Sequence, residues 1–119
     1  MKAYLINVKS KQITEVNINT WEDISPAIGC EIFSCPHITE ENDVLYCDDE
    51  GLLHNNIEGF FKLDSYPQPI AGNGLILGDD GEGDSADVHI DLETLKSRVK
   101  FMSHNEAYVE ALKSYNQFN

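Results

Sequence analysis

The chain has 119 residues, of which 41% are hydrophobic and 24% are charged, which is the composition of a globular protein with one modest core. We therefore predict a single domain over residues 1–119. No apolar stretch approaches the roughly 20 residues that span a bilayer. The N-terminus lacks the pattern of a signal peptide, and the three cysteines are too sparse for a disulfide-stapled secreted scaffold, so we expect a cytoplasmic protein with reduced thiols.

The acidic residues are concentrated in the middle of the chain. The net charge is −13, and residues 40–93 contain 15 acidic residues but one basic residue, Lys62. A field of this sign repels nucleic acid and anionic membranes and attracts cations or basic protein surfaces. We therefore expect neither direct binding to nucleic acid nor binding to a membrane.

The N-terminal segment predicts a β-hairpin. Residues 3–8 alternate in polarity, so that Tyr4, Ile6 and Val8 lie on one face of a strand. A polar turn follows, and residues 13–18 have the composition of the second strand.

A short helix is predicted after the hairpin. Thr20 and Asp23 have the spacing of a capping box at its start. Pro26 limits its length and Gly29 ends it. We expect Trp21, in the first turn, to anchor this helix in the core.

The middle of the chain predicts short strands separated by polar turns. Apolar and β-branched side chains gather in residues 31–35, 43–47, 57–64, 75–77 and 87–90. Two prolines and an Asn-Gly pair in residues 65–74 interrupt any regular element there.

Two helices are predicted at the C-terminal end. Asp91 is placed to cap the first, and Ser103 with Glu106 forms a capping box for the second. The apolar stripe of the first is Leu92, Leu95 and Val99. That of the second is Tyr108, Ala111, Leu112 and Tyr115.

The order of these elements predicts an α+β fold. We expect a mainly antiparallel sheet of about five or six short strands and a short helix in the N-terminal half of the chain. The two C-terminal helices are expected to pack on one side of that sheet.

An acidic loop has the outline of a phosphate-binding site. Gly78, Gly83 and Ser85 fall at the spacing of G-x-x-x-x-G-K-[ST]. Asp84 stands where that motif needs its lysine, and neighbouring carboxylates would repel a phosphate. The sequence therefore does not indicate a nucleotide site here.

A divalent cation suits these carboxylates better than a phosphate does. Asp80, Glu82 and Asp84 have the spacing of the first three ligands of an EF-hand loop, although Ser85 replaces its essential glycine. If the second acidic cluster, residues 48–50, folds against this loop, the two can hold Ca²⁺ or Mg²⁺. The candidate ligands are Asp48, Asp49, Asp79, Asp80, Glu82 and Asp84. A solvated acidic turn is the alternative.

The histidines and cysteines give weaker indications. His89 lies among acidic residues, which makes it a candidate general acid or base because nearby carboxylates hold its proton. Cys30, Cys35, His37 and Cys47 are zinc-ligand types, but their spacing lacks a C-x-x-C knuckle. No catalytic residue is predicted.

Two runs carry a family resemblance: DVLYCDDEGLL (43–53) and GFFKLDSYPQPIAGNGLILGDDGEGDSADV (59–88). With their Y-x-D-D-E-G-L and G-N-x-x-x-x-G turns, they resemble a family of small acidic proteins of phages, plasmids and genomic islands that is known only as a domain of unknown function. The resemblance covers about residues 1–100. It implies a cytoplasmic accessory protein of mobile DNA, and it assigns no catalytic residue.

The leading hypothesis is a non-enzymatic protein that turns its acidic surface towards a basic partner, such as the nucleic-acid-binding surface of a host protein, which it would inhibit. The candidate partner-binding residues are Glu40, Glu41, Asp43, Asp48, Asp49, Glu50, Asp79, Asp80, Glu82 and Asp84. One alternative is a cation-binding module or metal-dependent enzyme that uses the carboxylates of residues 48–50 and 79–84. A further alternative is a small-ligand binder with a pocket lined by residues 59–61 and 67–74.

Overall fold

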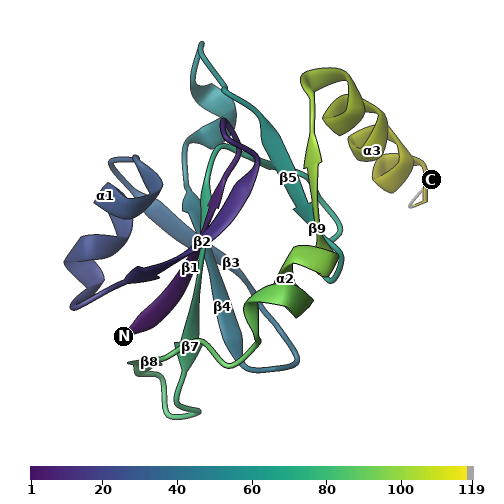
Figure 1. The fold of residues 1–119 in the computed structure, drawn as a ribbon. Helices are drawn as coiled ribbons and strands as arrows, with labels where there is room; N and C mark the ends of the chain where they lie inside the picture. Colours follow the sequence, from purple (N-terminus) through teal and green to yellow (C-terminus); the bar gives the residue numbers. More distant parts are fainter. Residues whose placement is uncertain (118–119) are drawn as a thin grey trace.

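The computed structural model describes residues 1–117, which form two antiparallel sheets and three α-helices (Figure 1). The strands are β1 (Lys2–Asn7), β2 (Gln12–Asn17), β3 (Phe33–Ile38), β4 (Asp43–Asp48), β5 (Phe60–Leu63), β6 (Ile70–Ala71), β7 (Gly74–Asp79), β8 (Ser85–Ala86) and β9 (Val99–Met102). The helices are α1 (Ile24–Ile28), α2 (Leu92–Arg98) and α3 (His104–Gln117), with 3₁₀ turns η1 (Trp21–Asp23) and η2 (Gly51–Leu53). No helix in this described part of the chain is long and apolar enough to cross a membrane.

The α+β prediction is confirmed, but the described strands number nine rather than five or six and divide into two sheets. The larger sheet has the order β2-β1-β7-β4-β3, with β8 paired to the end of β7. The smaller sheet has the order β6-β5-β9. Residues 74–78 of β7 are all buried, so this strand forms the centre of the larger sheet.

The larger sheet buries apolar side chains on both faces. On one face, Tyr4, Ile6 and Val8 are buried together, as the alternation predicts. They belong to the same core cluster as Phe61 of the smaller sheet and Leu95 of α2. The smaller sheet and α2 therefore close this face.

Helix α1 covers the opposite face of the sheet. Its Ile24 and Ile28 are buried in one cluster with Leu75 and Leu77 of β7. Alternate residues of β7 thus point to the two cores, which explains why the strand is apolar throughout.

The predicted capping box at Thr20 and the predicted stop at Gly29 both form, but the box precedes the 3₁₀ turn η1 rather than α1 itself. Asp23 Oδ2 accepts the N–H group of Thr20 at 3.1 Å, and Gly29 ends α1 with a φ of +88°. The prediction that Trp21 anchors the helix is wrong, because its side chain is 69% exposed. Ile24, one turn later, takes the core position instead.

The strand predicted at residues 87–90 lies earlier, as the two-residue strand β8. Beyond it, the Val88 N–H group donates to the carbonyl of Lys2 at 2.9 Å. The N–H groups of His89 and Ile90 donate to the carboxylate of Asp43 at 2.8 and 3.0 Å. Because the Asp43 side chain accepts the N–H groups of His89 and Ile90, these two groups do not form the hydrogen bonds of a β-sheet.

Helix α2 begins as predicted, but it is shorter than its apolar pattern suggests. Asp91 Oδ1 accepts the N–H group of Thr94 at 2.9 Å, and the helix ends at Arg98. Val99 begins β9, a strand that the sequence does not predict, and pairs with Leu63 of β5. This pairing completes the smaller sheet.

The two C-terminal helices do not pack together on one side of the larger sheet. Helix α2 contacts β2 and β9, whereas α3 contacts β5 and β9 and extends away from the larger sheet (Figure 1). Within residues 104–113 of α3, Ala107 is buried, while Tyr108 is 66% and Leu112 is 42% exposed. The predicted core-facing stripe of α3 is therefore wrong at these positions, and the side chain of Tyr115 lies outside the described part.

Candidate functional site

The antiparallel pairing of β4 with β7 brings two acidic turns to one end of the molecule. Asp43, at the start of β4, lies opposite the end of β7. The turn at residues 39–42 and the loop at residues 79–84 are therefore neighbours. Two hydrogen bonds join them: the Asp79 N–H group donates to the Asn42 carbonyl at 3.0 Å, and Asn42 Nδ2 donates to the Asp79 carbonyl at 3.1 Å.

The loop at residues 79–84 orders itself through its own carboxylates. Asp80 Oδ1 accepts the N–H groups of Glu82 at 2.7 Å and Asp84 at 3.2 Å. Asp79 Oδ1 accepts the N–H group of Gly81, which has a φ of +87°. A phosphate would need these N–H groups as donors, but the loop's own carboxylates already accept them. The loop is therefore an acidic turn and not a phosphate-binding loop.

We define the acidic end as Glu40, Asp79, Asp80, Glu82 and Asp84. Four of these five residues are exposed, and Asp79 is half-buried at the base of the loop. They are half of the ten candidate partner-binding residues, and the pairing of β4 with β7 gathers them on one surface.

The neighbouring Glu41 is paired with a cation. Arg98, at the end of α2, donates from Nη1 to both carboxylate oxygens of Glu41, at 3.0 and 2.9 Å. These hydrogen bonds hold the pKa of Glu41 below its usual value. The pair contributes no net charge, so Glu41 adds little to the field of the acidic end.

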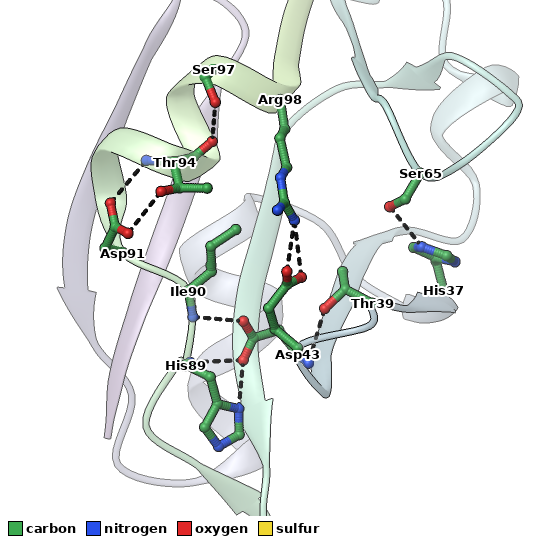
Figure 2. A network of polar contacts seen from close by, with 11 residues as sticks. His37, Thr39, Asp43, Ser65, His89, Ile90, Asp91, Thr94, Ser97 and Arg98 are labelled. Atoms are coloured by element: carbon green, nitrogen blue, oxygen red, sulfur yellow. Dashed lines mark hydrogen bonds and ion pairs between the residues drawn. The ribbon is translucent and has the colours of Figure 1, made fainter.

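Asp43 is fully buried and is a structural residue, so its assignment to a partner-binding surface is wrong. Its carboxylate accepts the N–H groups of His89 and Ile90 and also contacts His89 Nδ1 at 2.9 Å (Figure 2). The carboxylate neighbour expected for His89 is thus Asp43. The side chain of His89 itself is 44% exposed, and its use as a general acid or base stays a prediction.

The second acidic cluster lies at the opposite end of β4. Asp48 is five residues beyond Asp43, a separation of about 17 Å along an extended strand. Its carboxylate accepts the Glu50 N–H group at 2.9 Å and contacts His54 Nε2 at 2.7 Å, which leaves the side chain 11% exposed. Residues 48–50 and 79–84 therefore do not meet. Among the described residues, no group of three or more His, Cys, Asp or Glu is arranged to hold a metal ion.

The cysteines do not form a metal-binding group with His37 among the described residues. Cys47 is buried, whereas Cys35 is exposed on β3, and desolvation raises the pKa of both thiols. His37 shares a 2.9 Å hydrogen bond with Ser65. Cys47 is part of the core cluster, which favours a packing role for this thiol.

The family is identified from the first 100 residues of the chain. The family model DUF3846, a domain of unknown function, matches residues 1–100. The chain belongs to this family. No curated protein and no solved structure gives a significant match. The matched residues include both turns of the acidic end and all of the larger sheet, whereas α3 lies beyond them.

A groove joins the DUF3846 region to α3. It has a volume of about 1000 Å³ and lies between η2, the smaller sheet and α3. Its lining residues include Leu52 and Leu53 of η2, Phe60 and Ile70 of the smaller sheet, and Tyr108 of α3. A smaller pocket of about 480 Å³ adjoins η2 and contains His54, Asn56 and Asn73 among its lining residues.

In this DUF3846 protein, the two segments predicted to form a small-ligand pocket both contribute residues to the groove. Phe60 and residues 68–71 line the larger groove, while Phe61 is fully buried in the core. Sequence reasoning missed Leu52 and Leu53, which are 73% and 77% exposed. The sequence signal for their exposure was that these two leucines stand between an acidic run and a polar run. A segment with so few apolar residues is too short to form a core strand.

Proposed function

We propose that this DUF3846 protein is a non-enzymatic interaction protein whose acidic end binds a basic surface on a partner protein. The observation that carries the proposal is the direct hydrogen bonding between the turn at residues 39–42 and the loop at residues 79–84. This link gathers exposed carboxylates from two distant segments of the chain onto one surface.

The charges of the acidic end are available to a partner. Glu40, Glu82 and Asp84 are exposed, and none of the ion pairs found in the described residues uses them. Clustered charges of one sign raise the association rate of an oppositely charged surface and disfavour partners of the same sign. The surrounding field reinforces this effect, because the whole chain has a net charge of −13.

The geometry favours a compact basic patch over a long nucleic-acid channel. Duplex DNA carries one charge per about 1.7 Å of its axis, so a mimic of a long duplex needs carboxylates along an extended face. The acidic end occupies one end of a molecule that measures 38 Å in its longest dimension. A nucleic-acid-binding protein of the host fits the proposal if a few lysine and arginine side chains dominate its contact. By occupying them, this chain would act as an inhibitor.

Two variants of equal charge separate the acidic end from net charge. The acidic-end variant carries Glu40→Gln, Asp80→Asn, Glu82→Gln and Asp84→Asn. The control variant carries Glu15→Gln, Glu22→Gln, Glu31→Gln and Glu58→Gln, all at exposed positions. Both change the net charge from −13 to −9. The side-chain oxygen that remains after Asp80→Asn can still accept the two loop N–H groups, so the loop keeps its hydrogen bonds.

The experiment is affinity capture from a lysate of the cells that produce this protein. The wild-type chain and the two variants are immobilised and compared in parallel. We expect the wild type and the control variant to retain the same basic protein, and the acidic-end variant to lose it. Added DNA should compete with the chain for that protein. Equal retention by both variants, or retention of acidic proteins only, would overturn the proposal.

A further inference from the structure

The groove between η2 and α3 exposes more apolar surface than folding alone requires. Leu52 and Leu53 are 73% and 77% exposed, and Tyr108 faces the same groove with 66% of its surface exposed. Large apolar side chains grouped around a concave surface mark an interaction site, whereas single exposed ones are ordinary. Leu53 and Tyr108 are 55 residues apart in the chain, so the grouping is a product of the fold.

The wall that α3 forms is fixed in place at its first turn. Ser103 Oγ accepts the N–H group of Glu106 at 3.2 Å and Glu106 Oε1 accepts the N–H group of Ser103 at 3.1 Å, which confirms the predicted capping box. The ring of His104 meets Phe60 edge-on at 5.1 Å, and its Nε2 contacts the Ile57 carbonyl at 3.0 Å. The groove is therefore preformed where Tyr108 enters it, which reduces the entropy lost when a partner binds.

The charges around the groove have one sign. Asp48 and Asp49 line it, and no lysine or arginine does so among the described residues. Asp49 is exposed, so its carboxylate is available to a cation at the edge of the apolar surface. A second copy of the chain is disfavoured, because two molecules of net charge −13 repel each other. Charge complementarity therefore favours a basic occupant.

From this combination we infer that the groove binds an amphipathic, lysine- or arginine-rich segment of a partner protein. Its apolar side chains contact Leu52, Leu53 and Tyr108, and its cations lie beside the exposed Asp49. This is the helix-in-groove mode of recognition, in which apolar anchors supply affinity and flanking charges supply orientation. The inference shares with the proposed function the expectation of a basic partner, but it concerns a different surface.

The test uses defined peptides on the whole chain. The probe is a fluorescein-labelled helical peptide of leucine and lysine, with leucines at i, i+3, i+4 and i+7. One comparison peptide has glutamate in place of lysine, and another has serine in place of leucine. Fluorescence anisotropy should show binding of the leucine–lysine peptide that is at least tenfold tighter than binding of either comparison peptide.

Variants of the chain locate the binding site. Leu52→Ser/Leu53→Ser should weaken binding of the leucine–lysine peptide by about tenfold or more, because leucine burial is lost. Trp21→Ser/Ile38→Ser removes two other exposed apolar side chains, which lie outside the groove, and it should change the affinity by less than about twofold. Both pairs are exposed in the folded chain, so circular dichroism should show unchanged folds.

Several outcomes would overturn the inference. They are equal binding of the serine–lysine peptide, equal binding of the leucine–glutamate peptide, no binding, or equal losses in the two apolar variants. Sedimentation of the chain alone could give one more such outcome. If the chain forms a dimer and Leu52→Ser/Leu53→Ser abolishes it, the groove is occupied by a second copy of the chain. The acidic-end variant keeps the groove intact, so its peptide affinity should equal that of its control of equal charge, whatever the fate of the proposed function.

Discussion

At the scale of single residues, Asp43 has the clearest structural role. Its carboxylate is buried and satisfies two backbone N–H groups of the segment that leads into α2. We expect Asp43→Ala to lower the free energy of unfolding by about 3 kcal/mol, because buried donors lose their acceptor. The measurement is urea unfolding, with a lower midpoint at an unchanged m-value. A midpoint equal to that of the wild type would show that the network is dispensable.

Gly78, near the end of β7 where β8 pairs with it, leaves no space for a side chain. A Cβ atom at this position would lie 2.1 Å from the carbonyl oxygen of Asp87, which is a backbone atom. Gly78→Ala should therefore lower the free energy of unfolding by about 2 kcal/mol or more, and lower Tm by several degrees. Gly83→Ala is the control: the site is open but φ is +94°, so the loss should be about 1 kcal/mol. A larger loss at Gly83 than at Gly78 would contradict this account.

The carboxylates with lowered pKa values set the response to acid. Hydrogen bonds from Arg98 to Glu41, and from Thr94 to Asp91, lower the pKa of each carboxyl group in the folded chain. The unfolded chain therefore takes up these protons first as the pH falls. Stability from both groups is present above their ordinary pKa values, 4.5 and 3.8, and is lost as the pH falls through the lowered values.

Urea midpoints measured between about pH 3 and pH 7 test this dependence. The midpoint should fall in acid, and Glu41→Gln should make the fall shallower. Glu15→Gln, at an exposed position, serves as the control. An unchanged acid limb in Glu41→Gln would remove Glu41 from the explanation.

At the scale of elements, the acidic loop between β7 and β8 should not bind a divalent cation specifically. The Asp80 carboxylate already accepts two backbone N–H groups of the loop, and residues 48–50 lie at the other end of β4. Millimolar Ca²⁺, Mg²⁺ or Mn²⁺ should therefore raise Tm no more than NaCl of matched ionic strength. A cation-specific rise of several degrees, lost in Asp79→Asn/Asp80→Asn, would establish a metal site instead.

The predictability of each element depends on where its hydrogen bonds go. The β1–β2 hairpin and the caps at Asp91 and Ser103 were predictable, because their signals are local. Strand β9 was not, because VKFM follows a helix directly and acquires strand geometry by pairing with β5. Residues 87–90 have a strand composition, yet Asp43, more than 40 positions away, takes their donors.

The candidate site was predictable in composition but not in arrangement. The excess of carboxylates in residues 40–93 is visible in the sequence, and so is the acidic loop. Which of them share a surface depends on the register of β4 on β7, and this register has no local signal. The apolar residues of α3 have helical spacing, and spacing alone does not distinguish a face that packs from one that lines a groove.

At the scale of the whole molecule, β4 separates two surfaces of different character. Its start adjoins the acidic end, where the exposed groups are carboxylates. Its last residues, Cys47 and Asp48, line the groove, where leucine and tyrosine side chains dominate the exposed surface. Because the two surfaces are far apart, variants at one should leave the function of the other unchanged.

The association rate with the basic protein that the wild-type chain captures tests the central claim most directly. Stopped-flow or surface-plasmon measurements over a range of NaCl concentrations would compare the acidic-end variant with its control of equal charge. We predict that the acidic-end variant associates at least tenfold more slowly at low salt, with a shallower dependence on salt, because local charge steers the encounter. Identical rates and salt dependences in the two variants would contradict the account and leave net charge as the sole electrostatic contribution.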